Sequence, residues 1–399
     1  MADRAEAATI KARIAGEVRA LHPRLIAASH DLHEHPEIAF EERRASALLT
    51  EALEEDGFTV ERGVAGLETA FVATFGAGGP TVAILAEYDA LPKLGHACGH
   101  NLIATWALGA GLALRRALPP GVGTVKVIGT PAEEGGGGKA IMAQAGLFAG
   151  LDAALMMHPR DVTYLERGSL ALTSFEIAFH GRAAHASAYP ERGINALDAI
   201  LHLFFGVNAF RQALPPKVRI HGIITHGGEA VNVVPDYAAC SFLLRAPEQG
   251  ILAGVRERFL GIVRGAEAAT GATAAIEEGR SYPHRVSNPA LVGAFRENLL
   301  ALGQRYETPG PDVGIGSSDS ATVSHLVPMI HPYWQICEPP TGAHTPAFAA
   351  AARSPRADES LLTGSIALAQ TAADVLLDAA LRAELRARFA EQFGHPPQG

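Results

Sequence analysis

Three short apolar segments, each separated from the next by enough chain for a helix, constrain the fold of this sequence more than any other feature. They are residues 81–86, 124–130 and 152–157. Each has the length of a strand and is apolar almost throughout, as is typical of central parallel strands that helices cover on both faces. We therefore predict an α/β domain built on a mainly parallel sheet.

Residues that bind metals or protons follow each of these segments. They are Asp89, His96, Cys98 and His100 after the first, Glu133 and Glu134 after the second, and His158 after the third. Ligands of open parallel sheets bind beyond the carboxyl ends of the strands, so these side chains should meet at one edge of the sheet. Imidazole, thiolate and carboxylate donors together suit Zn²⁺ or a related ion, and so many donors predict a pair of ions rather than one structural zinc.

The adjacent carboxylates Glu133 and Glu134 predict two separate roles. Neighbouring residues of extended backbone point in opposite directions, so one carboxylate can bind a metal while the other faces the substrate. A carboxylate beside a metal-activated water is a good general base. Taken singly, Cys98, His158 and the Glu pair are each more typical of a core position or a solvated turn. Their joint position at strand ends favours the metal-site interpretation.

Residues 169–283 follow a different order and predict an inserted domain. The predicted strands are residues 172–180, 217–226, 237–246 and 272–279, and the predicted helices are residues 193–213 and 248–270. This β-α-β-β-α-β order is that of the ferredoxin-like unit. Helical patterns and further polar motifs return after the segment, so we expect residues 1–168 and 284–399 to form one discontinuous catalytic domain.

Helical patterns also mark the two ends of the chain. The apolar spacing of residues 5–33 predicts a helix, and Pro23 predicts a break within it. Residues 357–391, rich in Ala, Leu and Arg, predict the closing helices.

The charge and the apolar runs exclude several classes of function. The net charge is -9, from 33 basic and 42 acidic residues, and no run of Lys or Arg offers a nucleic-acid surface. The N-terminal residues lack the apolar core of a signal peptide, and the longest apolar run, residues 102–114, is too short to span a membrane. Three cysteines do not form a disulfide framework. We expect a soluble cytoplasmic protein that binds neither nucleic acid nor membranes.

Seven motifs spread along the chain resemble those of one enzyme family. They read AEYDALPKLGHACGHN (86–101), GTPAEEGGGGK (129–139), MMHPRD (156–161), HGRAAHASAYPERGINALDA (180–199), GGEAVNVVPD (227–236), SSDSATVSH (317–325) and GAHTPAF (342–348). They are similar to the dinuclear metallopeptidase family of aminoacylase, carnosinase and succinyl-diaminopimelate desuccinylase. Within it they resemble the amidohydrolase branch, and most of all the beta-alanyl-lysine dipeptidase and aminobenzoyl-glutamate hydrolase group. The resemblance implies a phosphorylase/hydrolase-like catalytic domain with an inserted lid or dimerisation domain.

The resemblance also implies a metal site. The residues that look like the ligands of the amidohydrolase branch are Cys98, His100, Glu134, His158 and His344. They would hold two divalent ions per chain, with Zn²⁺ or Mn²⁺ expected first and Co²⁺ or Ni²⁺ as alternatives. Asp89 is similar to the acid that orients one of these ligands.

Further roles follow from the same resemblance. Glu133 looks like the general base, and His185 resembles a histidine that reaches the active site of the partner subunit in a homodimer, where it stabilises the oxyanion. Asn232 and Arg245 fall where family members contact the substrate. The implied reaction is the metal-dependent hydrolysis of an amide bond in a small dipeptide or N-acyl amino acid.

The sequence departs from the wider family at two positions of the site. Glu87 stands where most members have a metal-binding His, and Cys98 stands where they have a bridging carboxylate. His96 could add a ligand, although a structural role is the better interpretation. The alternatives are an aryl-amide hydrolase of the aminobenzoyl-glutamate type and a non-catalytic metal-binding protein that keeps the fold. The presence of Glu133 argues against the second, because a binding protein needs no base.

Overall fold

The computed structural model describes residues 4–310 and 313–398, which divide into two compact units. The first unit comprises Met1–Gly168, Val286–Gly314 and Asp319–Gly399 within those limits, and the second comprises Ser169–Arg285 and Ile315–Ser318. The inserted domain was predicted at residues 169–283. The second unit begins at the same residue, ends two residues later and also includes the short segment Ile315–Ser318.

A six-stranded sheet lies at the centre of the first unit. Its order is β1-β2-β4-β3-β5-β11. The strands are β1 (Thr59–Arg62), β2 (Phe71–Gly76), β3 (Thr81–Ala86), β4 (Thr124–Gly129), β5 (Ala153–Leu155) and β11 (Met329–Ile330). The pairs β4–β3, β3–β5 and β5–β11 are parallel, whereas β1 and β2 join antiparallel at one edge. The prediction of a mainly parallel sheet is confirmed, and its three predicted strands are β3, β4 and β5.

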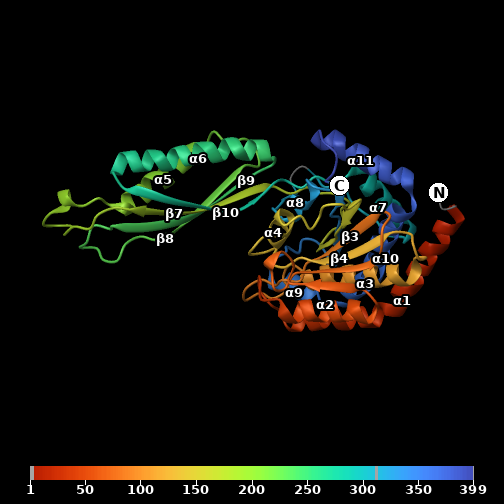
Figure 1. Ribbon diagram of the computed structural model, residues 1–399. Helices are drawn as coiled ribbons and strands as arrows, with labels where there is room; N and C mark the ends of the chain where they lie inside the picture. Colours follow the sequence, from red (N-terminus) through yellow and green to blue (C-terminus); the bar gives the residue numbers. More distant parts are fainter. Residues whose placement is uncertain (1–3, 311–312, 399) are drawn as a thin grey trace. The chain divides into compact units, whose positions relative to one another are not determined.

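Helices α3 and α10 pack against the parallel strands, and α1 lies across both of these helices (Figure 1). The helices of this unit are α1 (Arg4–Glu34), α2 (Arg43–Glu55), α3 (His100–Ala117), α4 (Gly138–Gln144), α7 (Pro289–Ala301), α8 (Ser320–Ser324), α9 (Pro346–Ala351), α10 (Pro355–Leu377) and α11 (Ala379–Phe393). Helix α3 is buried on almost every side, because it lies between the sheet and a second helical layer. Its first residue, His100, is thereby fixed at the edge of the core.

The predicted break at Pro23 is wrong, because α1 runs without interruption from Arg4 to Glu34. A proline inside a helix removes one backbone hydrogen bond and costs about 3 kcal/mol or more. Leu21 and Leu25, on either side of the proline, are both buried in the core. The packing of one continuous helix against α3 and α10 therefore outweighs the local cost.

The second unit has the predicted ferredoxin-like order. Its elements are β7 (Ala171–His180), α5 (Ala196–Arg211), β8 (Arg219–His226), β9 (Tyr237–Ala246), α6 (Gln249–Thr270) and β10 (Thr273–Tyr282). The four strands form an antiparallel sheet in the order β10-β7-β9-β8, with α5 and α6 on one face (Figure 1). Strand β10 extends three residues beyond its predicted end, because Tyr282 and Ser281 continue the pairing with β7 after an irregularity.

One helix has the length and apolar composition of a membrane span. It is α10, Pro355–Leu377, and 78% of its apolar window is buried inside the structure. Burial of this kind is typical of a core helix, and α10 packs on both the sheet and α1.

Candidate metal centre

Loops at the carboxyl ends of the parallel strands bring the predicted ligands together. The loop after β3 carries Cys98 and ends at His100, the first residue of α3. The chain after β4 carries Glu133 and Glu134. A short strand, β6 (His158–Arg160), follows β5 and pairs in parallel with β12 (Tyr333–Gln335). The expectation that these side chains meet at one edge of the sheet agrees with this topology.

Cys98, His100 and His158 form one group whose ligand atoms lie within 4.8 Å of one another. The Cys98 Sγ atom is 3.4 Å from His158 Nε2. His100 Nδ1 lies 2.9 Å from Asp89 Oδ1, so the Asp89 carboxylate accepts a hydrogen bond from that nitrogen. His100 Nε2 is buried and makes no hydrogen bond with the described residues, so this nitrogen is the one left to bind a metal. A divalent metal would fit this arrangement of donors.

Cys98 also belongs to a second group, with Glu134 and His344. His344 Nε2 lies 3.1 Å from Glu134 Oε1, and the Glu134 side chain is 12% exposed whereas that of His344 is 52% exposed. The second oxygen of Asp89 accepts a hydrogen bond from the Glu134 backbone N–H at 2.9 Å. Asp89 therefore fixes a member of each group, as expected of an acid behind the ligands.

Left-handed backbone conformations occur beside or at three of these residues. Gly99, between Cys98 and His100, has φ +75°, and a Cβ there would lie 2.5 Å from a Pro159 side-chain carbon. His344 has φ 63° although it is not glycine. For a non-glycine residue such as His344 this conformation costs of order 1–3 kcal/mol and persists where the surrounding structure imposes it, whereas glycine adopts it freely. Here these conformations turn the side chains of the two loops toward the same point.

The two adjacent glutamates have opposite electrostatic properties. Burial, together with the neighbouring Glu87 carboxylate, raises the pKa of Glu133 well above that of an ordinary carboxyl. Burial also opposes ionisation of Glu134, but its hydrogen bond with His344 and the charges of His100 and His344 together outweigh this effect and lower the pKa. Glu134 is therefore suited to bind a cation as a carboxylate, and Glu133 is suited to accept a proton.

The pKa values of Cys98 and His100 depend on burial and on the neighbouring charged groups. Burial beside Glu134 raises the pKa of Cys98. Burial opposes protonation of His100, but the Asp89 carboxylate and the Cys98 side chain together outweigh this effect and raise the pKa. A divalent ion would reverse both effects, because it stabilises a thiolate and takes the lone pair of an imidazole. Metal binding to these residues should therefore release protons.

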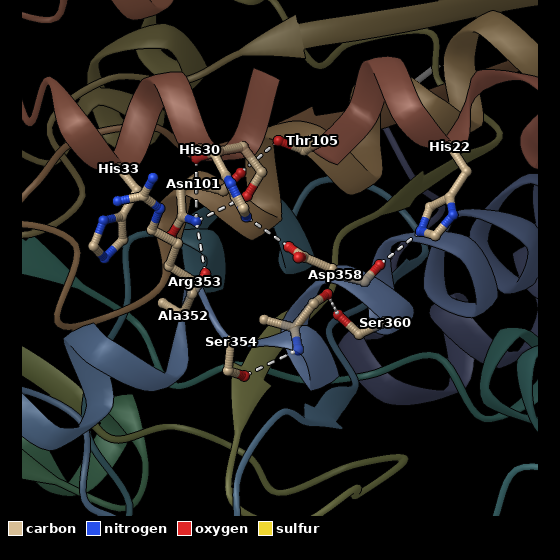
Figure 2. A network of polar contacts seen from close by, with 12 residues as sticks. His22, His30, His33, Asn101, Thr105, Ala352, Arg353, Ser354, Asp358 and Ser360 are labelled. Carbon is tan, nitrogen blue, oxygen red and sulfur yellow. Dashed lines mark hydrogen bonds and ion pairs between the residues drawn. The ribbon is translucent and has the colours of Figure 1, made fainter. Parts of the chain in front are cut away.

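Helix α1 connects the two ligand loops through a network of polar contacts (Figure 2). Asn101, directly after His100, donates hydrogen bonds to Ser29 Oγ on α1 and to the Ala352 carbonyl, each at 2.9 Å. His30 Nε2 lies 2.8 Å from Asp358 Oδ1 on α10, and His33 Nε2 lies 2.8 Å from the Ala349 carbonyl on α9. Helix α9 follows His344 in the chain. The network therefore fixes the loop that carries His344 against the loop that ends at His100.

Three predicted site residues lie in the second unit. His185 and Asn232 are exposed and lie on paired segments, because Ala186 N–H donates to the Asn232 carbonyl at 3.0 Å. Arg245 lies near the other end of β9, opposite Leu172 of β7. Within this unit the structure groups His185 with Asn232 and separates both from Arg245.

His96 is not a member of any candidate metal group among the described residues. It is buried, and its ring centroid lies 6.1 Å from that of His33. Burial, with His100 nearby, lowers the pKa of His96 to about 3, so its imidazole is neutral. A structural role for His96 agrees with this environment.

A second set of charged residues surrounds Glu133, and their grouping was not predicted from the sequence. Glu87, Glu133 and Asp319 offer oxygens that lie within 4.8 Å of one another, and we call these three residues the carboxylate cage. The ammonium of Lys139 lies 2.5 Å from Glu87 Oε1 and 3.0 Å from Asp319 Oδ1. The only sequence signal was a lysine and an aspartate inside motifs already singled out for other residues.

Residues 83–373 match the model of peptidase family M20/M25/M40. The match covers more than half of the chain and includes all the candidate ligands described above. The chain belongs to this family. The predicted family resemblance is therefore confirmed.

Relatives and solved structures agree with this membership. The Xaa-Arg dipeptidase of Mus musculus is 39% identical over 96% of this chain and 93% of its own length. One component of the p-aminobenzoyl-glutamate hydrolase of Escherichia coli is 36% identical over 68% of this chain and 60% of its own length. A dinuclear metal-binding M20 peptidase of Bacillus subtilis has a TM-score of 0.68 and 25% identity, and the match covers 90% of this chain and 99% of that protein. The predicted fold and the predicted class, a metal-dependent amidohydrolase, are confirmed.

Proposed function

We propose that this chain hydrolyses the amide bond of a small dipeptide or N-acyl amino acid, with Glu133 as general base. The observation that carries the proposal is the opposite pKa shift of two adjacent glutamates, one paired with His344 and one held among other carboxylates. The two relatives named Xaa-Arg dipeptidase, at 39% and 36% identity, favour a dipeptide with a basic C-terminal residue. The relative named as a hydrolase of aminobenzoyl-glutamate favours an aryl amide as the second candidate.

Cys98, His100, Glu134, His158 and His344 would hold two divalent ions, with Zn²⁺ or Mn²⁺ as the first candidates. When bound, such ions polarise the amide carbonyl and lower the pKa of a water molecule. The donor set supports this proposal, because two of the candidate groups share Cys98 and their residues follow the ends of neighbouring strands. Asp89 would orient His100 through the 2.9 Å hydrogen bond at Nδ1, which leaves Nε2 to coordinate.

The proton path of the proposed reaction runs through Glu133. Its carboxylate takes a proton from water as the water oxygen attacks the carbonyl carbon. It then passes that proton to the amide nitrogen as the C–N bond breaks, so the products are an acid and an amine. The raised pKa of Glu133 suits both steps, because a carboxylate that binds a proton more tightly than usual can hold it until the amine leaves. His185 would donate a hydrogen bond to the oxyanion.

The second unit supports a homodimer in the proposed function. Strand β8 is an edge strand with Ile223 and Ile224 exposed, and α5 beside it exposes Leu201 and Phe205, the last at 76%. Open strand edges and apolar patches of this kind are sites of association, and a two-fold pair would join two copies through the same surface.

His185 would act in the site of the partner subunit. The chain enters this unit at Ser169 and leaves it at Arg285, next to the end of β7 that pairs with Arg245. His185 follows the other end of β7, roughly 30 Å along the strand from Ala171. Arg245 therefore lies near the end of this sheet at which the chain enters and leaves the unit, whereas His185 lies beyond its other end. We also propose a cytoplasmic location for the enzyme.

Mixing two inactive variants tests this sharing of sites. His185→Ala and Glu133→Ala homodimers should each be nearly inactive. After dissociation and reassociation at equal amounts, half of the dimers are mixed and each has one intact site, so specific activity should recover to about a quarter of wild type. The measurement is amine release before and after reassociation. As a control, adding Phe205→Glu to both variants should prevent dimer formation and therefore the recovery of activity. Recovery that persists in monomers would refute the shared site. Confirmed mixed dimers that show no recovery would refute it as well.

The reaction itself is tested by metal removal and replacement. The metal-free protein should release no amine, and Zn²⁺, Mn²⁺, Co²⁺ or Ni²⁺ added separately should restore activity to different extents. The panel is beta-alanyl-lysine, an Xaa-Arg dipeptide, aminobenzoyl-glutamate, N-acetyl amino acids and indole-acetyl amino acids. Preference for the basic dipeptides would support the first candidate, and preference for aminobenzoyl-glutamate the second. Two bound ions with no hydrolysis of any member would contradict both.

A further inference from the structure

The carboxylate cage holds its negative charges away from solvent. Glu87 and Asp319 are fully buried, and Glu133 is half-buried beside them. Two oxygens bound to one divalent ion, each about 2.1–2.4 Å from it, lie roughly 3–4.8 Å apart. The cage oxygens lie within that limit, and an all-carboxylate set suits hard ions such as Mn²⁺.

An ammonium group already lies between two of these carboxylates, those of Glu87 and Asp319. Lys139 is fully buried, and its Nζ contacts Glu87 Oε1 at 2.5 Å and Asp319 Oδ1 at 3.0 Å. Its backbone N–H donates to the second Asp319 oxygen at 2.9 Å, so the aspartate is bound by both parts of one residue. Residue 139 therefore cannot move away from the cage without breaking contacts along its backbone and side chain.

The cage also adjoins the candidate metal centre through two of its members. Glu87 Oε2 lies 3.7 Å from His100 Nε2, and Glu133 belongs to a third candidate group with His100 and Glu134. A cation in the cage would therefore compete for the Glu133 carboxylate. If that cation were a metal, Glu133 would become a ligand and could no longer carry a proton.

We infer that Lys139 is a fixed internal cation that keeps metal ions out of the carboxylate cage and so leaves Glu133 available as a base. Lys139 is a positioning residue in this proposal, since it acts through Glu87 and Asp319. The consequence for catalysis rests on the proposed role of Glu133, whereas the exclusion of metal does not. Lysine suits this task because a covalently attached ammonium cannot be exchanged for an ion from solution, and two of the cage carboxylates, those of Glu87 and Asp319, bind it directly.

The test uses the different metal preferences of the two sites. The candidate metal centre, with its Cys and His donors, is first filled with Zn²⁺, and Mn²⁺ is then titrated into the holoenzyme. Mn²⁺ uptake is followed by electron paramagnetic resonance and by elemental analysis of the separated protein. Wild type should take up no tightly bound Mn²⁺. Lys139→Met, which keeps the length of the side chain without its charge, should take up about one Mn²⁺ per chain.

Two further variants make the result specific. Combining Lys139→Met with Asp319→Asn removes one carboxylate from the cage. The Mn²⁺ affinity of this double variant should therefore be at least tenfold lower than that of Lys139→Met. Lys11→Met is the matched control, because Lys11 forms a partly buried pair with Asp374 at 2.6 Å that is not part of any candidate metal group among the described residues. It should take up no Mn²⁺. Uptake by both single variants, or by neither, would overturn the inference.

Activity gives a second readout on the same samples. In Lys139→Met, kcat should fall as Mn²⁺ is added, with the same midpoint as Mn²⁺ uptake, and the double variant should lose this inhibition. Inhibition without uptake would refute the link to the cage. If Lys139→Met does not fold without a cation in the cage, added Mn²⁺ should restore the circular dichroism spectrum of the folded protein. A spectrum that Mn²⁺ does not restore would overturn the inference. Because uptake is measured without substrate, an error in the proposed reaction would leave this result unchanged.

Discussion

Replacing Glu133 with Gln should lower kcat by roughly 10²–10⁴-fold while the protein keeps its metal content. Glutamine has nearly the same shape as glutamate but cannot accept the proton from water. Glu133 faces the carboxylate cage and lies outside the pair formed by Glu134 and His344, so its neutralisation removes a base and not a ligand of that pair. The measurement combines kcat with elemental analysis of the same preparation. Normal turnover in Glu133→Gln would disprove the assignment.

Two comparisons separate the loss of a base from other effects. Glu134→Gln should lose metal as well as activity, because Glu134 is held as a carboxylate beside His344. Glu54→Gln removes an exposed glutamate paired with Arg62 and should change neither quantity by more than about twofold. A Glu133→Gln variant that lost its metal would show that Glu133 is a ligand, against the proposal.

The pH dependence of the reaction should change with the same substitution. Glu133 must be ionised to accept a proton, and burial with Glu87 nearby raises its pKa above that of an ordinary carboxyl. In wild type, kcat/KM should therefore rise with pH until Glu133 is ionised and level off above that point. At constant metal content, Glu133→Gln should lose this acid limb. If the acid limb of the kcat/KM profile is unchanged in Glu133→Gln, a group other than Glu133 causes it.

Replacing Cys98 with Ala should remove both metal ions, whereas replacing His344 with Ala should remove one. Cys98 is the residue shared by the group with His100 and His158 and the group with Glu134 and His344. A thiolate that served both groups would also screen the repulsion between two divalent ions, so its loss would weaken both sites. We expect about two ions per chain in wild type, fewer than about 0.3 in Cys98→Ala and about one in His344→Ala, with activity lost in both variants.

A rescue and a control accompany the Cys98 prediction. Cys98→Asp should recover both ions, because a carboxylate can bridge two metals. Cys240→Ala, which removes a buried thiol in the second unit, should keep full metal content and activity. The readout is elemental analysis after passage over a chelating resin. Retention of one ion by Cys98→Ala would show that Cys98 belongs to one site only.

Much of the catalytic unit could be predicted from local patterns. The apolar runs at β3, β4 and β5 define central strands because burial on both faces requires apolar side chains throughout. The polar residues directly after them were expected at one edge because parallel strands end on the same side. Strands β1 and β2 were not predicted, since β1 is short and largely exposed and β2 joins the sheet by pairing with β4, which is distant in the sequence.

What the sequence by itself determined is the set of donors and the order of elements, since both depend on residue type and spacing along the chain. What only the tertiary structure decided is which charges meet. Lys139 and Asp319 are 180 residues apart, and their contact appears only when α4 and α8 pack together. The continuity of α1 through Pro23 likewise depends on α3 and α10. Electrostatic interactions act through space, so a buried lysine and three carboxylates form one cluster only after packing excludes water from between them.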